Sequence, residues 1–149
     1  MSTHVASARA VSAPRTALLL IAAVVVAGLA NTVIALAAVA TGAPSTYGPL
    51  TAPAYLTFTT VGVLVGYLGW RIVRRSVPRP ARALRVLVPV VLVLSWVPDL
   101  LLATLQFIPG TTLTGALALG LMHAVVVGVA VPVYARIAPL PDGVVHTLP

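Results

Sequence analysis

Four long apolar stretches restrict this chain to folds that cross a lipid bilayer. They lie at about 17–41, 53–73, 86–107 and 113–135. A helix rises about 1.5 Å per residue, so about 20 apolar residues cover the roughly 30 Å hydrocarbon layer. The chain is 60% hydrophobic and 7% charged, whereas soluble domains are about half apolar and about a quarter charged. The sequence therefore predicts an all-α integral membrane four-helix bundle.

The arginines predict the orientation of this bundle. All nine basic residues are arginines: two precede the first stretch, six lie within 71–85, and Arg136 follows the last stretch. Four crossings place all of them on one side, which is the positive-inside pattern. We therefore predict a multi-pass protein of the cell membrane with cytoplasmic tails at 1–16 and 139–149 and one domain at 17–138. Topology accounts for the net charge of +7, so we expect the lipid bilayer, and no nucleic acid, as its partner.

The first stretch has an alternative interpretation as a cleavable signal peptide. It follows Arg9 and Arg15 and ends near the small residues AVATGA at 38–43. The apolar region of a signal peptide is about 7–15 residues long, and this one is about 25. We therefore expect the segment to be retained as a transmembrane helix.

Each predicted helix carries one strong polar residue at a similar depth. Counted from the outer ends, Asn31 lies about 15 Å deep, Thr60 about 10 Å, Asp99 about 13 Å and His123 about 15 Å. Ser95 lies one turn from Asp99 on the same helix face. An aspartate at the centre of a membrane helix costs about 2.5–3.5 kcal/mol, so it is expected to face the bundle interior and to have a partner. His123 is the one ionisable candidate at that depth, and such a pair titrates as a unit. The alternative is that these residues only join the helices by hydrogen bonds.

Two prolines predict kinks beside these polar residues. Pro98 has no N–H to donate to the carbonyl of Leu94, so this carbonyl is free to accept from water or from Asn31. Pro132 has the same effect on the fourth helix, at the carbonyl of Gly128.

Small residues predict the faces on which the helices pack. Helices gain no hydrophobic free energy by associating in lipid, so small residues that permit close approach are enriched at their interfaces. Such stripes comprise Ala27, Asn31, Ala35 and Ala38 on the first helix, Thr59, Gly62, Gly66 and Gly69 on the second, and Gly120, Ala124 and Gly128 on the fourth. We expect them to face inward, with a homodimer interface as the alternative.

Several kinds of site are excluded or disfavoured. The chain has no cysteine, which excludes disulfides and thiolate chemistry. One aspartate and one histidine are too few for a typical zinc site, so we expect no metal, and no sequence motif indicates a cofactor. Ser95, His123 and Asp99 can be drawn as a hydrolytic triad, but Ser95 and Asp99 are crowded on one helix face without an oxyanion hole. No catalytic residue is therefore assigned.

Two segments carry a resemblance to a known family. With WVPDLLL at 96–102 and LMHAVVVGVAVPVYARIAP at 121–139, the chain resembles small actinobacterial four-helix membrane proteins grouped as the uncharacterised DUF6069 family. The resemblance covers nearly all of the chain outside its tails and implies no activity. The absence of lysine and the abundance of alanine, valine and arginine fit a high-GC genome.

Three functions remain open from the sequence. The first is small-molecule binding or transport linked to a proton at Asp99 and His123. The second is a membrane enzyme that uses Asp99 as acid or base on a lipophilic substrate. The third is a non-catalytic subunit of a homodimer or of a complex with another membrane protein. It predicts that changes at Asp99 and His123 are tolerated and that Gly66→Leu is not.

Overall fold

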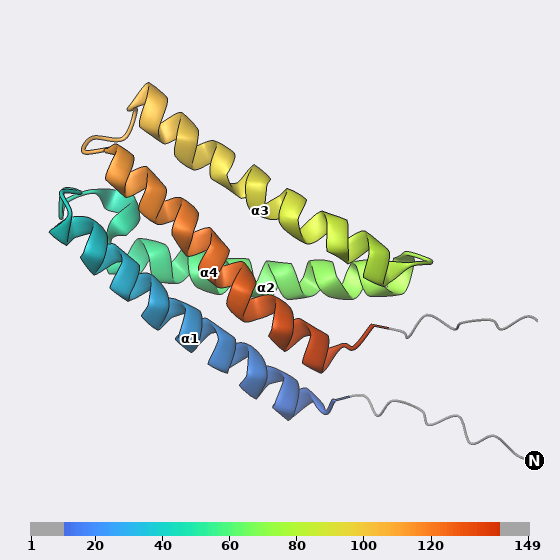
Figure 1. Ribbon diagram of the computed structural model, residues 1–149. Coiled ribbons are helices and arrows are strands. Elements are labelled where there is room, and N and C mark those ends of the chain that lie inside the picture. Colours follow the sequence, from blue (N-terminus) through green and yellow to red (C-terminus); the bar gives the residue numbers. More distant parts are fainter. Residues whose placement is uncertain (1–10, 141–149) are drawn as a thin grey trace, which may run out of the picture.

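The computed structural model describes residues 11–140 and contains four long helices connected in antiparallel order (Figure 1). These are α1 (Ala13–Ala40), α2 (Ala52–Ser76), α3 (Pro80–Leu105) and α4 (Leu113–Ile137), with a short 3-10 helix, η1 (Gly48–Leu50), before α2. All four are long and apolar enough to cross a membrane, and no strand is present in the described range. The all-α four-helix membrane fold is therefore confirmed. The predicted tails lie mostly outside this range.

The helix boundaries differ from the predicted ones mainly at the N-terminal ends. α1 begins four residues earlier than expected and α3 begins six residues earlier. Both have proline in the first turn, Pro14 in α1 and Pro80 in α3. Proline suits this position because the first N–H groups of a helix have no internal partner. Arg82 and Arg85 consequently belong to α3, where long side chains can extend toward the headgroups.

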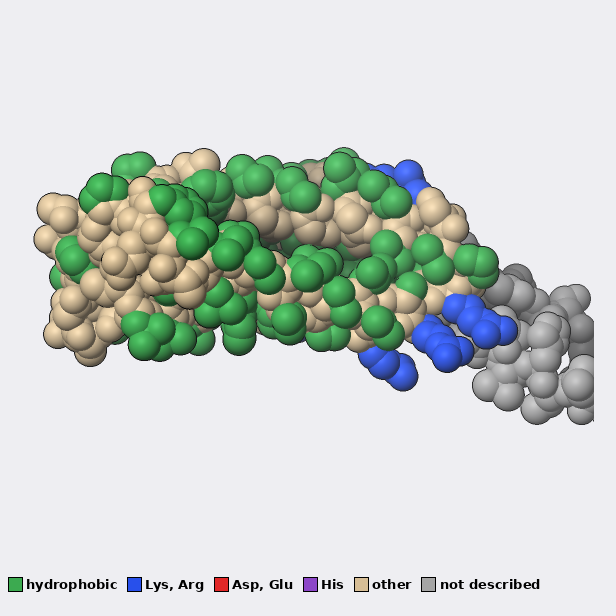
Figure 2. Space-filling model, turned by 90° about the horizontal axis from the view of Figure 1, so that it is seen from above, with side chains coloured by type: hydrophobic (Ala, Val, Ile, Leu, Met, Phe, Trp, Pro, Cys, Tyr) green, Lys and Arg blue, Asp and Glu red, His purple; other side chains and the backbone are tan. Residues whose placement is uncertain are grey.

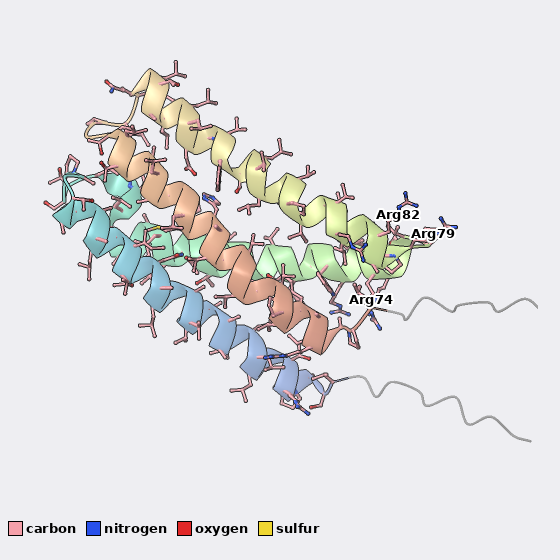
Figure 3. All side chains as sticks on the ribbon, in the orientation of Figure 1. Arg74, Arg79 and Arg82 are labelled. Atoms are coloured by element: carbon pink, nitrogen blue, oxygen red, sulfur yellow. The ribbon has the colours of Figure 1, made fainter. Side chains whose placement is uncertain are left out.

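Eight arginines lie within the described range, all at or near helix ends that share one end of the bundle. We refer to this as the arginine end. Figure 2 shows arginines gathered there on the visible face, and Figure 3 shows Arg79 and Arg82 at the α2–α3 connection and Arg74 beside the end of α4. The opposite end consists of the uncharged connections 41–51 and 106–112, and we refer to it as the uncharged end.

The arginine end is held together by aromatic side chains and by the residues that follow α4. The indole N–H of Trp70 donates to the Ala138 carbonyl at 3.0 Å, and the Arg74 Nε donates to the Pro139 carbonyl at 2.8 Å. The Tyr134 hydroxyl donates to the Val63 carbonyl at 2.5 Å. These contacts fix α4 against α2.

Small residues build the most extensive helix interface, between α1 and α4. The predicted stripe on α1 is confirmed as buried, at Ala27, Asn31, Ala35 and Ala38. Ala35 and Ala38 cluster with Ala118, Leu119 and Met122 of α4.

The predicted glycine stripe on α2 lies against α4 at Gly62 and Gly66 but meets no helix at Gly69. Gly62, Gly66 and Gly69 are exposed, and a Cβ atom added at Gly69 would meet no atom within 4 Å. Gly66 is the tight position, since a Cβ there would lie 2.7 Å from the Tyr134 hydroxyl oxygen. A Cβ at Gly62 would lie 3.7 Å from Val126 of α4, so among the three glycines the predicted inward packing face is wrong for Gly69 alone.

The glycines of α4 behave differently from one another. Gly120 is buried, and an added Cβ would lie 3.6 Å from the indole nitrogen of Trp96. Gly128 is exposed and would meet no atom within 4 Å. The inward prediction thus holds for Gly120 and is wrong for Gly128. Both α3 and α4 continue as single helices through their internal prolines, Pro98 and Pro132.

Candidate functional site

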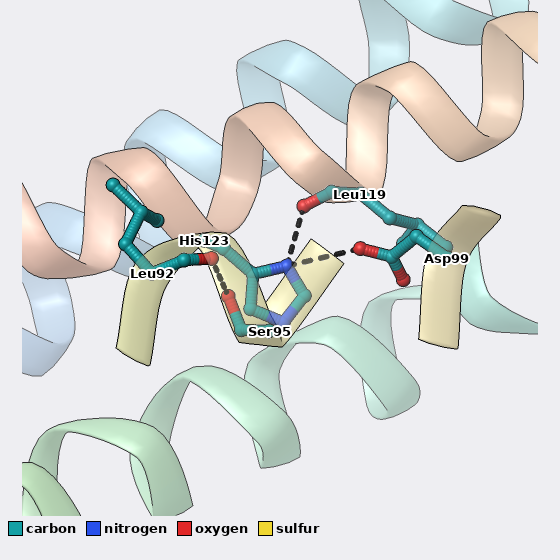
Figure 4. Close-up of polar contacts among 5 residues, drawn as sticks. All are labelled: Leu92, Ser95, Asp99, Leu119 and His123. Atoms are coloured by element: carbon teal, nitrogen blue, oxygen red, sulfur yellow. Dashed lines mark hydrogen bonds and ion pairs between the residues drawn. The ribbon is translucent and has the colours of Figure 1, made fainter. Parts of the chain in front are cut away.

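The structure brings Asp99 of α3 and His123 of α4 together inside the membrane-spanning region. The imidazole Nδ1 lies 3.3 Å from the carboxylate Oδ2 (Figure 4). Asp99 is 7% exposed and is one of three buried residues on a helix whose other positions are mostly exposed. The His123 side chain is 41% exposed. The acid is therefore the buried member of the pair, and the imidazole remains accessible from the space beside it.

His123 lies close to Asp99 but does not donate a hydrogen bond to its carboxylate oxygen Oδ2. Nδ1 of His123 also lies 2.8 Å from the carbonyl oxygen of Leu119, one turn earlier on α4. The single N–H on Nδ1 is aligned with this carbonyl, and Asp99 Oδ2 is buried without a hydrogen-bond partner. The 3.3 Å separation still permits charge attraction when the imidazole is protonated. Asp99 can therefore accept a hydrogen bond from another group.

Ser95 lies one turn from Asp99 but does not join the pair. Its hydroxyl donates to the Leu92 carbonyl of its own helix at 2.6 Å (Figure 4). No hydrogen bond links it to His123 in residues 11–140. A serine nucleophile must hydrogen-bond to its base, so the geometry gives no support to a hydrolytic triad.

A second polar pair connects α1 to α2. Asn31 is 1% exposed, and its Nδ2 donates to the Thr59 Oγ1 at 2.8 Å, while its Oδ1 has no hydrogen-bond partner. The predicted alternative partner of Asn31, the Leu94 carbonyl beside Pro98, is not used. Asn31 therefore resembles Asp99 in having a buried oxygen that lacks a donor.

Thr60 lies outside the site, contrary to the prediction. Its hydroxyl donates to the Leu56 carbonyl, and its side chain lines a separate apolar groove with Leu20 and Val24 of α1. Thr59 is the inward residue, because consecutive helical positions point about 100° apart. The signal for Thr59 was present in the sequence, since it shares a helix face with Gly62 and Gly66.

Both polar pairs line one cavity of about 840 Å³. Its walls come from α2, α3 and α4, and α1 contributes Asn31. This volume lies within the range of about 300–1,000 Å³ typical of ligand pockets. The polar side chains of the wall are few: Asn31, Thr59, Ser95, Asp99 and His123, with Tyr55, Trp70 and Tyr134 contributing rings. Apart from Thr60, every predicted polar residue reaches this cavity.

A family model described as a family of unknown function, DUF6069, matches residues 11–139. The chain belongs to this family. The match covers all four helices and confirms the resemblance noted from the two segments on α3 and α4. No curated protein and no solved structure gave a match.

The chemistry available in this DUF6069 cavity is that of one carboxyl group and one imidazole. Fewer than three metal-ligating side chains cluster anywhere in the described part of the chain. A carboxyl–imidazole pair can exchange a proton and can hold a hydrogen-bond donor or a cation. The residues present therefore support binding and proton exchange more directly than bond cleavage.

Proposed function

We propose that this protein binds a small amphiphilic molecule within the membrane and that the binding is linked to a proton at Asp99 and His123. One observation carries the proposal: a buried carboxyl group lies 3.3 Å from a partly exposed imidazole, and both line a cavity of about 840 Å³. Transport across the membrane is the process that such a site would serve.

The link to a proton follows from the cost of an isolated charge in lipid. An ionised Asp99 without compensation costs about 2.5–3.5 kcal/mol at the centre of a membrane helix. Either a proton on the carboxylate or a positive charge on His123 removes this cost. An imidazole changes its charge close to physiological pH, and interacting groups titrate jointly. A ligand that changes how the negative charge of Asp99 is compensated therefore changes the number of protons bound by the Asp99–His123 pair.

The gathering of the arginines at one end of the bundle supports a cytoplasmic arginine end, with both termini and the α2–α3 connection inside the cell. This orientation puts the Asp99–His123 pair in the outer half of the membrane. Reporter fusions at the α2–α3 connection and at the uncharged loop 42–47 test it, and an external α2–α3 connection would contradict it.

A non-catalytic subunit is the second candidate, and the exposed surface of α3 favours it. Only Pro80, Leu84 and Asp99 of this helix are buried. A second copy or another membrane protein could cover the remaining leucines and valines. An enzyme has less support, because the Ser95 hydroxyl is bonded to its own helix and Asp99 is the sole acidic residue of the described range.

The deciding experiment is the titration of Asp99 and His123 in purified protein in nanodiscs. Carboxylate infrared bands report Asp99, and histidine NMR signals report His123. We expect His123 to titrate between about pH 5 and 8 and its transition to shift in Asp99→Asn. Thr60→Val is the matched control, because Thr60 faces away from the cavity, and it should leave the titration unchanged. If His123 titrates identically in Asp99→Asn, the two groups are not coupled and the subunit function is favoured.

A further inference from the structure

The cavity has the form of a long apolar groove with its polar group far from one end. At the arginine end it is lined by Trp70 and Leu84, and at the uncharged end by Pro49 and Ile108. Leu84 and Asp99 are fifteen positions apart on α3, which corresponds to about 22 Å along the helix. The wall between the arginine end and Asp99 consists largely of valine, leucine and glycine. A hydrocarbon chain fits this section.

Gly69 on α2 leaves part of this groove open. Gly62, Gly66 and Gly69 all line it, and a Cβ atom at Gly69 would meet no atom within 4 Å. These two helices meet at their short connection, residues 77–79, and diverge toward the uncharged end (Figure 1). A chain-bearing molecule can therefore enter sideways from the lipid.

The carboxylate at the far end of this apolar section can accept a hydrogen bond from a ligand, and its charge favours a donor that is positively charged. Asp99 Oδ2 is buried and accepts no hydrogen bond, and Asp99 is the sole acidic side chain of residues 11–140. A fatty alcohol would supply a donor but could not take over the positive charge that His123 provides. An ammonium group supplies both, and charge-assisted hydrogen bonds are stronger than neutral ones.

We infer that the ligand of this site is an amphiphilic cation, with its ammonium group on Asp99, its hydrocarbon chain along the α2–α3 groove, and its binding exchanged against one proton of the Asp99–His123 pair. The inference rests on the proposed function and specifies the class of ligand for the same site.

The exchange keeps the buried charge constant. Without ligand, Asp99 carries a negative charge and His123 a positive one. When an ammonium group binds to Asp99, the proton on Nε2 of His123 leaves to the solvent. The proton on Nδ1 stays, because Nδ1 faces the Leu119 carbonyl. One cation enters, one proton leaves, and the carboxylate is compensated in both states.

No other charged group competes for these roles in the described part of the chain. The other titratable side chains that line the cavity are Tyr55 of α2 and Tyr134 of α4. Tyr55 hydrogen-bonds to Thr32 of α1, and Tyr134 donates to the Val63 carbonyl. From α1, the cavity receives Asn31, which is neutral, and the arginines lie at the arginine end.

The test measures binding of dodecylammonium to the protein in phosphatidylcholine nanodiscs by calorimetry, with empty nanodiscs as the blank. Two buffers of different ionisation enthalpy count the protons. We expect about one proton released per cation, and an affinity that rises about tenfold per pH unit below the midpoint of the His123 titration. Asp99→Asn should weaken binding at least tenfold. Dodecanol should bind more weakly than the cation and release no proton.

Two leucine substitutions test whether the ligand binds in the groove or elsewhere on the surface. Gly69→Leu fills the groove at a position where a Cβ meets no atom, and Gly128→Leu adds the same side chain outside the groove at an equally open position. Gly69→Leu should weaken binding at least tenfold, and Gly128→Leu should leave it unchanged. If Gly69→Leu fails to fold, Val91→Trp fills the groove from α3, where Val91 is exposed.

The failures of the two proposals are distinguishable. Equal binding of dodecanol and dodecylammonium without proton release would overturn the cation site, although a coupled Asp99–His123 titration would still support proton-linked binding. Equal binding by wild type and Gly69→Leu would overturn the location of the chain. An absent coupled titration would overturn the proposed function itself.

Discussion

The interface between α1 and α4 and the space between α2 and α3 show what small residues do and do not decide in this bundle. On α1, Ala23, Ala27, Ala35 and Ala38 are buried, and the helix packs along α4. On α2, three glycines at similar spacing remain exposed beside a groove. Small residues permit close approach but do not produce it, since no hydrophobic driving force brings helices together in lipid.

The position of α3 explains the difference. Its contacts with α4 include the Trp96 ring beside Gly120 and Asp99 beside His123. Near the connection 77–79, Leu84 packs in the cluster that contains Trp70 of α2. With these attachments, α2 and α3 diverge from their connection toward the uncharged end (Figure 1). The resulting space is the candidate binding site.

The largest predicted effect lies in the interface between α1 and the rest of the bundle. Ala27 is 0% exposed, so Ala27→Leu must displace α1, and overpacking of this kind costs about 1–3 kcal/mol of unfolding free energy. Ala22→Leu adds the same group to an exposed position of α1 and should change stability by less than about 0.5 kcal/mol. Unfolding in mixed micelles of sodium dodecyl sulfate, followed by tryptophan fluorescence, measures both. Equal losses would show that this interface is not tightly packed.

The next effect concerns the attachment of α4 to α2. Tyr134→Phe removes the hydrogen bond to the Val63 carbonyl and should cost about 1 kcal/mol. Tyr47→Phe is the control, because the Tyr47 hydroxyl is fully buried without a partner. Its removal should leave stability unchanged or raise it. The same unfolding assay applies, and a larger loss in Tyr47→Phe would contradict the assignment of the two hydroxyls.

A smaller effect tests which threonine of α2 faces the interior. A double-mutant cycle with Asn31→Ala and Thr59→Ala should give a coupling of about 0.6 kcal/mol, the average for hydrogen bonds between membrane helices. The corresponding cycle with Thr60→Ala should give no coupling, because Thr60 bonds to its own helix. Coupling to Thr60 in place of Thr59 would require a rotation of α2.

The smallest effect on stability is expected in the groove. Gly69→Leu should change the unfolding free energy by less than about 0.5 kcal/mol, since an added Cβ meets no atom. It should nevertheless weaken ligand binding at least tenfold. A stability loss comparable to that of Ala27→Leu would mean that the space between α2 and α3 is closed in the membrane.

The sequence alone determined the number of helices, their membrane location, and the presence of an acid and an imidazole at a common depth. Length and hydropathy are local properties that require no knowledge of neighbours. The pairing of Asp99 with His123 was predictable because a buried charge requires compensation and the chain offers one ionisable partner at that depth.

Only the tertiary structure decided which faces meet. Thr59 and Thr60 are adjacent and chemically identical, and the rotation of α2 about its axis selects the inward one. Gly66 and Gly69 lie on one face, yet one approaches Tyr134 and the other meets empty space. The depth of a residue follows from counting along its own helix, whereas its neighbours depend on how each helix is placed and rotated against the other three.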